Sequence, residues 1–230
     1  MKRPAVGAGP RKSPGSDSAG NRKGEFPIYF LRDPVLCLVV GVPASGKTSL
    51  AQALAEKIAN AAYLSKDLIE TPFTDSERVS GDIYEMVRGP AFKILVDYAD
   101  IQLALCKIPI IDAPFSINHW RNDEYRDWIP PFKRAAEKNR ARLAIIRCIP
   151  PSEEILKKRI AGRLRRKESK WDQWKLDHWE EFMEREPIRF PIAHDDVFEF
   201  VSDEFFEEGV KNVLRRFLKA EEIAIGPLFQ

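Results

Sequence analysis

The sequence has few of the features that mark membrane, disulfide-rich or zinc-binding proteins. Its longest apolar stretch, Val35 to Val42, is far shorter than the roughly 20 residues that a membrane-spanning helix needs. It has only three cysteines, and they form neither a CxxC pair nor a cluster with the three histidines. These absences argue against an integral membrane protein, a disulfide scaffold and a structural zinc site, and they favour a reducing, cytoplasmic setting.

Net charge is also small, at +2 over 230 residues, but it is unevenly distributed. Residues 1–24 carry six basic side chains and one acidic side chain, a net +5, which leaves −3 for the rest of the chain. This first segment is rich in Gly, Pro, Ser and Ala. We therefore predict a disordered basic tail over 1–25, one domain over 26–220 and a C-terminal tail over 221–230. A targeting or nucleic-acid-contacting role of the basic tail is the alternative.

Apolar runs and amphipathic segments alternate over most of the chain. Runs typical of buried strands lie at 35–40 and 108–112, and further strands are predicted at 62–64, 142–148 and 198–201. Helical periodicity lies at 48–59, 90–106, 122–139, 152–164 and 206–217. This alternation predicts an α/β fold with about five parallel strands and helices on both faces of the sheet.

A complete G-x-x-x-x-G-K-[ST] motif separates the first of these strands from the first helix. Its glycines permit a loop that turns N–H groups toward phosphate oxygens, and the following helix adds its positive N-terminal end. Lys47 can reach the β- and γ-phosphates of ATP, and the Thr48 hydroxyl can bind Mg²⁺. The predicted nucleotide-binding segment is Gly41, Val42, Pro43, Ala44, Ser45, Gly46, Lys47, Thr48 and Ser49.

Other features narrow the class of P-loop protein. Neither an N-K-x-D motif nor a D-x-x-G switch occurs in a usable position, which argues against a GTPase. The third strand ends in one carboxylate, Asp112, whereas motor and AAA-type ATPases usually have an Asp-Glu pair there. A small kinase needs only a magnesium carboxylate, a base for the acceptor hydroxyl and cations over the phosphoryl group.

Three segments resemble small P-loop kinases: Gly41–Thr48, Tyr63–Glu70 and Ile110–Phe115. This group contains chloramphenicol phosphotransferase, zeta-toxin kinases and polynucleotide 5′-hydroxyl kinases, and the resemblance spans about residues 33–220. The stretch Trp171–Trp179 is similar to one in bacterial ATP-binding proteins of the same group, whose P-loop is of the AAA type. The resemblance implies a three-layer α/β/α P-loop NTPase sandwich, like nucleoside-monophosphate kinases, with a lid at about 157–180.

The resemblance also implies roles for two carboxylates. Asp67 matches the general base of the family, and its place just after a strand suits a ligand site; its alternative role is to cap the following helix. Asp112 would hold Mg²⁺ directly or through water, or it forms the turn before Ala-Pro.

Residues 157–170 carry eight basic side chains against one acidic side chain. In the resembling kinases this region is the lid, which closes over the phosphates and excludes water. Arg159, Arg163 and Arg166 share a helix face and are predicted to donate hydrogen bonds to the phosphates. Two alternatives stay open: a solvated helix face, or a grip on a polynucleotide backbone with nearby tryptophans stacked on its bases.

The sequence thus predicts an ATP- and Mg²⁺-dependent phosphotransferase with a hydroxyl-bearing small-molecule acceptor. The alternatives are a polynucleotide 5′-hydroxyl kinase and a nucleotide-binding regulatory protein without transfer chemistry. We expect the acceptor to lie along residues 68–106 and 115–126. A membrane partner is not expected.

Overall fold

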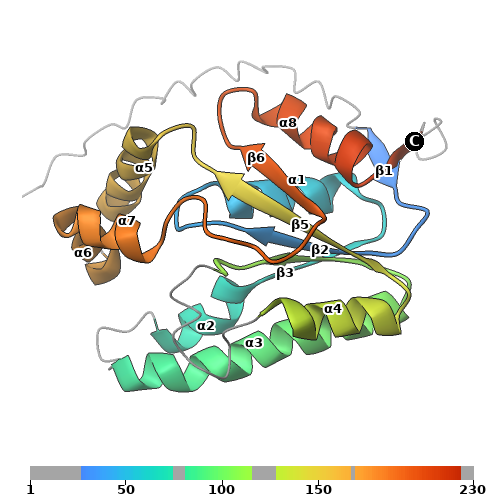
Figure 1. Cartoon of the computed structure of the whole chain (residues 1–230), viewed down its shortest axis with the longest axis horizontal. Helices are drawn as coiled ribbons and strands as arrows, with labels where there is room; N and C mark the ends of the chain where they lie inside the picture. Colours follow the sequence, from blue (N-terminus) through green and yellow to red (C-terminus); the bar gives the residue numbers. More distant parts are fainter. Residues whose placement is uncertain (1–26, 75–80, 116–127, 167–168, 224–230) are drawn as a thin grey trace, which may run out of the picture.

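The central feature of the protein is a five-stranded parallel sheet, seen in a computed structural model that describes residues 27–74, 81–115, 128–166 and 169–223. Its strand order is β3-β4-β2-β5-β6 (Figure 1). The strands are β2 (Val35–Val40), β3 (Ala61–Ser65), β4 (Ile108–Asp112), β5 (Arg142–Ile149) and β6 (Val197–Val201). The predicted α/β sandwich with five parallel strands is therefore confirmed, and Asp112 ends the strand beside the P-loop strand.

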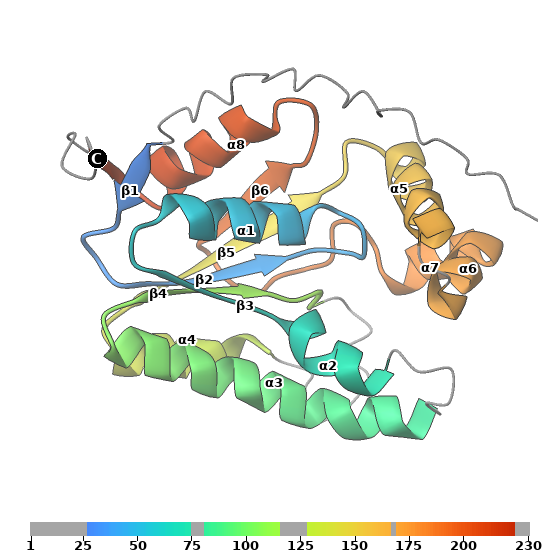
Figure 2. The same ribbon diagram turned by 180° about the vertical axis from the view of Figure 1, so that it is seen from behind.

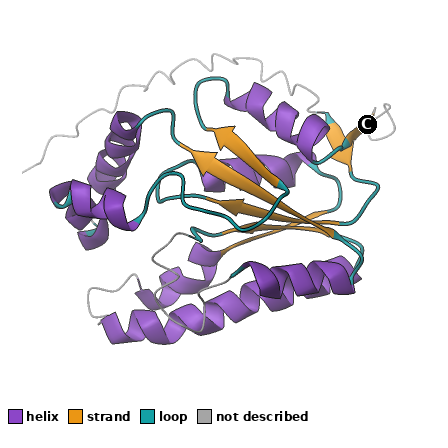
Figure 3. Ribbon diagram, viewed as in Figure 1, coloured by secondary structure: helices purple, strands orange, loops and turns teal. Residues whose placement is uncertain are grey.

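Helices cover both faces of this sheet (Figures 2 and 3). On one face lie α1 (Lys47–Lys57) and α8 (Phe206–Asn212), and α8 continues as a π-helical turn over Val213–Phe217. On the other face lie α3 (Gly81–Ala104) and α4 (Ile129–Lys138). All six residues of β2 are buried because a helix layer covers each side of that strand.

The helix before the β4 strand is longer than its sequence pattern predicts. We expected it to begin at Pro90, but α3 begins at Gly81 and carries Pro90 inside. Its first turns lie against α2 (Lys66–Thr74), so tertiary packing holds a helix that the proline alone would interrupt. The first part of the predicted helix 122–139 lies outside the described residues.

A second, two-stranded sheet joins the two ends of the described chain. Strand β1 (Ile28–Phe30) pairs antiparallel with β7 (Glu221–Ile223), and Arg32 forms an ion pair with Glu221. The first three residues of the predicted C-terminal tail are therefore a strand. Residues 1–25 and 224–230, the rest of both predicted tails, lie outside the described residues. No helix in the described part of the chain is long and apolar enough to cross a membrane.

Three helices form a separate unit at one end of the sheet, which we call the lid: α5 (Glu153–Arg166), α6 (Lys170–Asp177) and α7 (Trp179–Arg185) (Figure 1). Serine side chains cap two of them, Ser152 on α5 and Ser169 on α6. An apolar cluster ties the lid to the P-loop, and its buried members are Val42, Leu156, Ile160 and Phe182.

Candidate active site

The P-loop depends on two glycines whose backbone angles other residues rarely adopt. Gly41 has φ +150°, and a Cβ atom there would lie 2.5 Å from the carbonyl oxygen of Cys148. Gly46 has φ +99°, and its Cβ would lie 2.7 Å from the Cβ of Ser202. Gly46 is the N-cap of α1, and no described side chain caps that helix. The N–H groups at the start of α1 can therefore bind an anion such as a phosphate.

A cleft of about 560 Å³ opens at the carboxyl end of the sheet and extends to α5. It is lined by Ala44, Gly46, Lys47, Thr48, Ser49, Asp67, Arg159, Arg163, Arg166, Ser202, Asp203 and Phe206. The structure thus brings the P-loop lysine and threonine, the predicted base and all three predicted lid arginines to one cavity. Gly41, Val42, Pro43 and Ser45 do not line it, and Val42 packs against the lid instead.

Asp112 lies beneath this cleft and is hydrogen-bonded to its wall. Thr48 Oγ1 donates a hydrogen bond to Asp112 Oδ2 at 2.6 Å. Two further hydroxyls donate to the same oxygen, Ser65 at 3.3 Å and Tyr63 at 3.4 Å. The second oxygen, Oδ1, is buried and has no hydrogen-bond partner among the described residues. One carboxylate oxygen of Asp112 is therefore held in place, while the other is a buried polar atom whose missing partner a cation could supply.

These oxygen donors fit Mg²⁺. A hard cation of this kind prefers carboxylate and hydroxyl oxygens, and it typically takes its remaining ligands from water and substrate phosphates. Within the described ranges no group of three or more His, Cys, Asp and Glu side chains could enclose a metal. Thr48 and Asp112 are thus the residues that would hold Mg²⁺ beside a bound nucleotide.

The electrostatics of Asp112 reflect its buried position. Burial is the largest influence and raises the pKa of the Asp112 carboxyl above its usual range. The positive charge of Lys47 and the hydrogen bond from Thr48 act in the opposite direction, while the negative charge of Asp67 raises the pKa further. A cation at this place would relieve the cost of keeping Asp112 ionised.

Asp67 lies in the first turn of α2, where it is exposed and lines the cleft. Its backbone N–H donates to Ser65 Oγ at 3.3 Å, so Ser65 is the side chain that caps this helix. Ser65, and not Asp67, is therefore the residue that caps α2. Sequence reasoning missed Ser65, although a serine two residues before Asp67 and just ahead of a helix is a recognisable capping signal.

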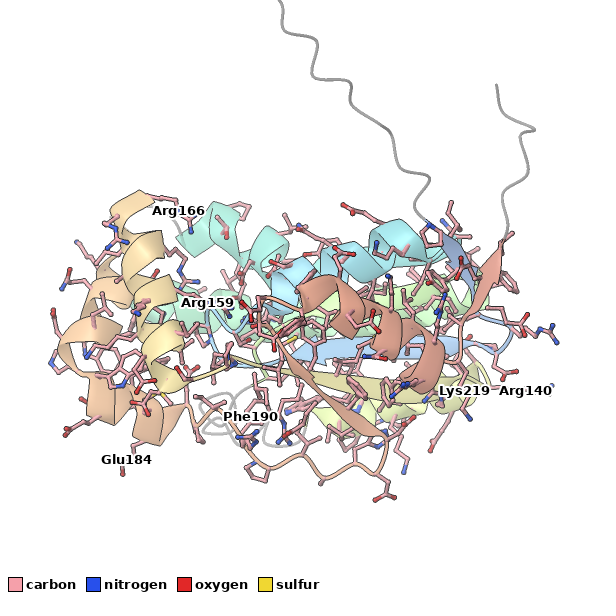
Figure 4. The ribbon with its side chains drawn as sticks, turned by 90° about the horizontal axis from the view of Figure 1, so that it is seen from above. Arg140, Arg159, Arg166, Glu184, Phe190 and Lys219 are labelled. Carbon is pink, nitrogen blue, oxygen red and sulfur yellow. The ribbon has the colours of Figure 1, made fainter. Side chains whose placement is uncertain are left out.

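The three lid arginines differ in their partners. Arg159 donates to Ser202 Oγ at 2.6 Å and to the Ser202 carbonyl oxygen. Arg163 donates to both carboxylate oxygens of Asp172, each at 2.5 Å. Arg166 is exposed, and its side chain has no hydrogen bond or ion pair to any other described residue. Figure 4 shows Arg159 and Arg166 projecting from the side of α5 that faces the sheet.

Asp172 is a structural partner that sequence reasoning did not identify. Its carboxylate is buried and also accepts a hydrogen bond from Lys175 at 2.9 Å. Burial would raise the pKa of Asp172, but the hydrogen bond from Arg163 and the contacts with Lys175 outweigh it and lower that pKa. The ion pair therefore joins α5 to α6 and holds the guanidinium of Arg163.

Comparison with known proteins agrees with this geometry. Residues 36–185, which include the P-loop, Asp67, Asp112 and the lid helices, match the family model of the AAA domain. The chain belongs to the AAA domain family. No curated protein matches the chain.

Two solved structures share the fold of this AAA domain. A candidate kinase from Chloroflexus aurantiacus is 23% identical, with a TM-score of 0.59, and the match covers 81% of this chain and 97% of that one. A sugar kinase from Janibacter sp. is 15% identical, with a TM-score of 0.50, covering 81% and 95%. Both likenesses concern the fold, which is that of P-loop kinases.

The tryptophans of the AAA domain's lid are mainly packing residues. Trp174 stacks on His178 with ring centroids 5.2 Å apart, and Trp179 contacts Phe182 edge-on at 5.6 Å. Trp171 differs, because 67% of it is exposed. Two of the three tryptophans are therefore engaged within the lid, which weakens the case for a row of bases stacked upon them.

The acceptor side of the cleft is described only in part. Leu68, next to Asp67, is 63% exposed. The predicted acceptor segments also include residues 75–80 and 116–126, which lie outside the described residues.

Proposed function

We propose that this protein is an ATP- and Mg²⁺-dependent kinase that transfers the γ-phosphate of ATP to a hydroxyl group of a small-molecule acceptor. The observation that carries the proposal is one cleft shared by Lys47, Thr48, Asp67 and the arginines of α5. Phosphoryl transfer to a hydroxyl is helped by a base near the phosphates that accepts the proton, and a carboxylate such as that of Asp67 can do this. Nucleotide binding alone needs no such base.

Each group of the cleft would have its own task. Lys47 and the N–H groups at the start of α1 bind the phosphates. Thr48 and Asp112 hold Mg²⁺, which when bound neutralises charge on the β- and γ-phosphates. Asp67 accepts the proton of the acceptor hydroxyl while the oxygen of that hydroxyl bonds to phosphorus and ADP leaves. Arg166 stabilises negative charge on the transferring group.

Arg159 and Arg163 contribute positive potential to the same cleft. Their guanidinium groups already bind Ser202 and Asp172, so they order the lid as well as attract the phosphates. Arg166 has no described partner. It is thus the best supported of the three arginines as a hydrogen-bond donor to the transferred phosphate.

Replacement of Asp67 by Asn tests the general base. Because the amide cannot accept the proton, we expect kcat to fall by roughly 10²- to 10⁴-fold while the affinity for ATP is unchanged. The matched control is Asp203→Asn, since Asp203 lines the same cleft and its carboxylate binds the backbone N–H of Phe205. Transfer is measured with γ-labelled ATP, and an unchanged rate for Asp67→Asn would show that Asp67 is not the base.

The same variants separate a kinase from a regulatory protein. If Asp67→Asn leaves every activity intact while Lys47→Ala abolishes nucleotide binding, the protein binds nucleotide without transferring phosphate. The acceptor is found by incubating the protein with γ-labelled ATP and pooled metabolites, antibiotics and oligonucleotides. A labelled oligonucleotide whose binding weakens steeply with salt would identify a polynucleotide kinase instead.

A further inference from the structure

Ser65 makes two hydrogen bonds that join the two carboxylates of the proposed kinase site. Its hydroxyl donates to Asp112 Oδ2 at 3.3 Å and accepts from the backbone N–H of Asp67, also at 3.3 Å. The residue is only 4% exposed, so water does not compete for these bonds. One side chain therefore contacts both the predicted metal carboxylate and the helix turn that carries the predicted base.

The fold places Ser65 at this junction. It is the last residue of β3 and lies directly opposite Asp112 in the parallel pairing of β3 with β4. Helix α2 begins at the next residue, so Ser65 is also its N-cap. A serine hydroxyl has a single proton. Because that proton goes to Asp112, the lone pairs of the oxygen face the N–H of Asp67.

We propose that Ser65 is a positioning residue that fixes Asp112 for magnesium binding and sets the start of α2, and with it Asp67, relative to the metal. This proposal rests on the roles given above to Asp112 and Asp67. Replacing a residue that hydrogen-bonds to a metal ligand commonly lowers metal affinity by roughly 10- to 100-fold. Tyr63 and Thr48 also donate to Asp112 Oδ2, but among the hydrogen bonds of the described residues it is Ser65 that connects that oxygen to α2.

The test uses Ser65→Ala and Mn²⁺ as a spectroscopic substitute for Mg²⁺. Mn²⁺ is titrated into the protein–ADP complex and followed by electron paramagnetic resonance, so the readout does not depend on an acceptor. We expect Ser65→Ala to weaken Mn²⁺ binding roughly tenfold. We expect Ser65→Thr, which keeps the hydroxyl, to restore most of the affinity. Wild-type Mn²⁺ affinity in Ser65→Ala would overturn the proposal.

Ser152→Ala is the matched control. Ser152 caps α5 in the same manner, with a 3.3 Å bond from the N–H of Ile155, but it has no contact with Asp112. A purely structural effect of losing a cap would therefore appear in both variants as a lower Tm. Loss of metal affinity in Ser65→Ala alone supports the proposal, and equal loss in both overturns it.

Two further variants keep the test decisive. If Ser65→Ala does not fold, Ser65→Gly removes the hydroxyl at a site where glycine is a tolerated N-cap, and the same weakening is expected. Asp112→Asn examines the underlying assignment. If Asp112→Asn binds Mn²⁺ like the wild type, the magnesium role of Asp112 fails, which is a different result from a failure at Ser65 alone.

Discussion

Asp112 is a carboxylate that is only 1% exposed, and its surroundings explain how the fold tolerates it. Three hydroxyls donate to one of its oxygens, and the charge of Lys47 acts on it as well. These groups offset part of the cost of burying the charge, but the pKa of Asp112 is still raised, mainly by burial. At neutral pH, where Asp112 must be ionised to bind Mg²⁺, the residue therefore lowers the stability of the metal-free protein.

Asp112→Asn should make this cost measurable. A carboxyl whose pKa is higher in the folded than in the unfolded protein stabilises the fold at low pH, and that contribution is lost as pH rises through the raised pKa. In EDTA at neutral pH we therefore expect Asp112→Asn to have a higher Tm than the wild type. The difference should shrink as pH falls toward about 4, near the ordinary Asp value of 3.8.

Asp100→Asn provides a control of opposite sign. The hydrogen bond from Lys138 is the largest influence on Asp100 and lowers its pKa, so its ionised form stabilises the fold above the ordinary pKa. This variant should lower Tm at neutral pH. A lower Tm for Asp112→Asn at every pH would contradict the account given for Asp112.

At the residue scale, the P-loop motif predicted Lys47 and Thr48, and the resemblance to small P-loop kinases implied Asp67 and Asp112. Lys47, Thr48 and Asp67 line one cleft, because a P-loop and a strand end follow local rules, and Asp112 lies beneath it. Ser65 was not predicted, because its bond to Asp112 depends on how β3 and β4 pair across 47 residues of sequence. The lid arginines share a helix face in the sequence. Their different partners, however, come from α6 and from the loop after β6.

At the scale of elements, strands were easier to predict than helix ends. Continuous apolar runs identify β2, β4 and β5, which are almost entirely buried, and the two less buried strands, β3 and β6, were also located. Strands β1 and β7 are three residues each and were not predicted. The sequence of β7, Glu-Glu-Ile, is exposed and has no apolar run, and the short run Ile28–Leu31 around β1 was not recognised as a strand. Helices α6 and α7 were not resolved by periodicity, because they are short and their apolar side chains pack against α5 and the P-loop as one cluster.

Two helical glycines should respond in opposite ways to Ala. A Cβ on Gly209 in α8 would lie 2.7 Å from the ring of Phe200, so Gly209→Ala should destabilise the fold by about 1–3 kcal/mol. A Cβ on Gly162 in α5 would meet only the Arg165 side chain, at 3.7 Å. Gly162→Ala should therefore stabilise by about 0.5–1 kcal/mol. Urea denaturation measures both, and equal effects would contradict this packing.

At the scale of the whole molecule, the lid and the body are held together by a small apolar cluster. Val42 of the P-loop packs with Leu156 and Ile160 of α5 and with Phe182 of α7. Arg159 adds a polar connection to Ser202, whose hydroxyl in turn donates to the Ser45 carbonyl oxygen at 2.5 Å. The base of the lid is thus attached to the P-loop, while Arg166 lies at the far end of α5.

Arg166→Ala should reveal whether this end of the lid acts on the phosphates. Because it removes a cation from the cleft without removing a described contact, we expect kcat to fall roughly 10²-fold with little change in Tm. Arg165→Ala is the matched control, since Arg165 is exposed on the same helix but does not line the cleft. Rates are measured with the acceptor found in the screen. Equal rates for the two variants would exclude a special role for Arg166.

The pairing of β1 with β7 also determines how this domain can be attached to other chains. Ile28 and Ile223 lie opposite each other, so both ends of the described chain leave the fold from one place. That place is on the opposite side of the molecule from the lid (Figure 2). The chain therefore enters and leaves the described fold on the side away from the nucleotide cleft, so neither crossing point lies at the cleft mouth.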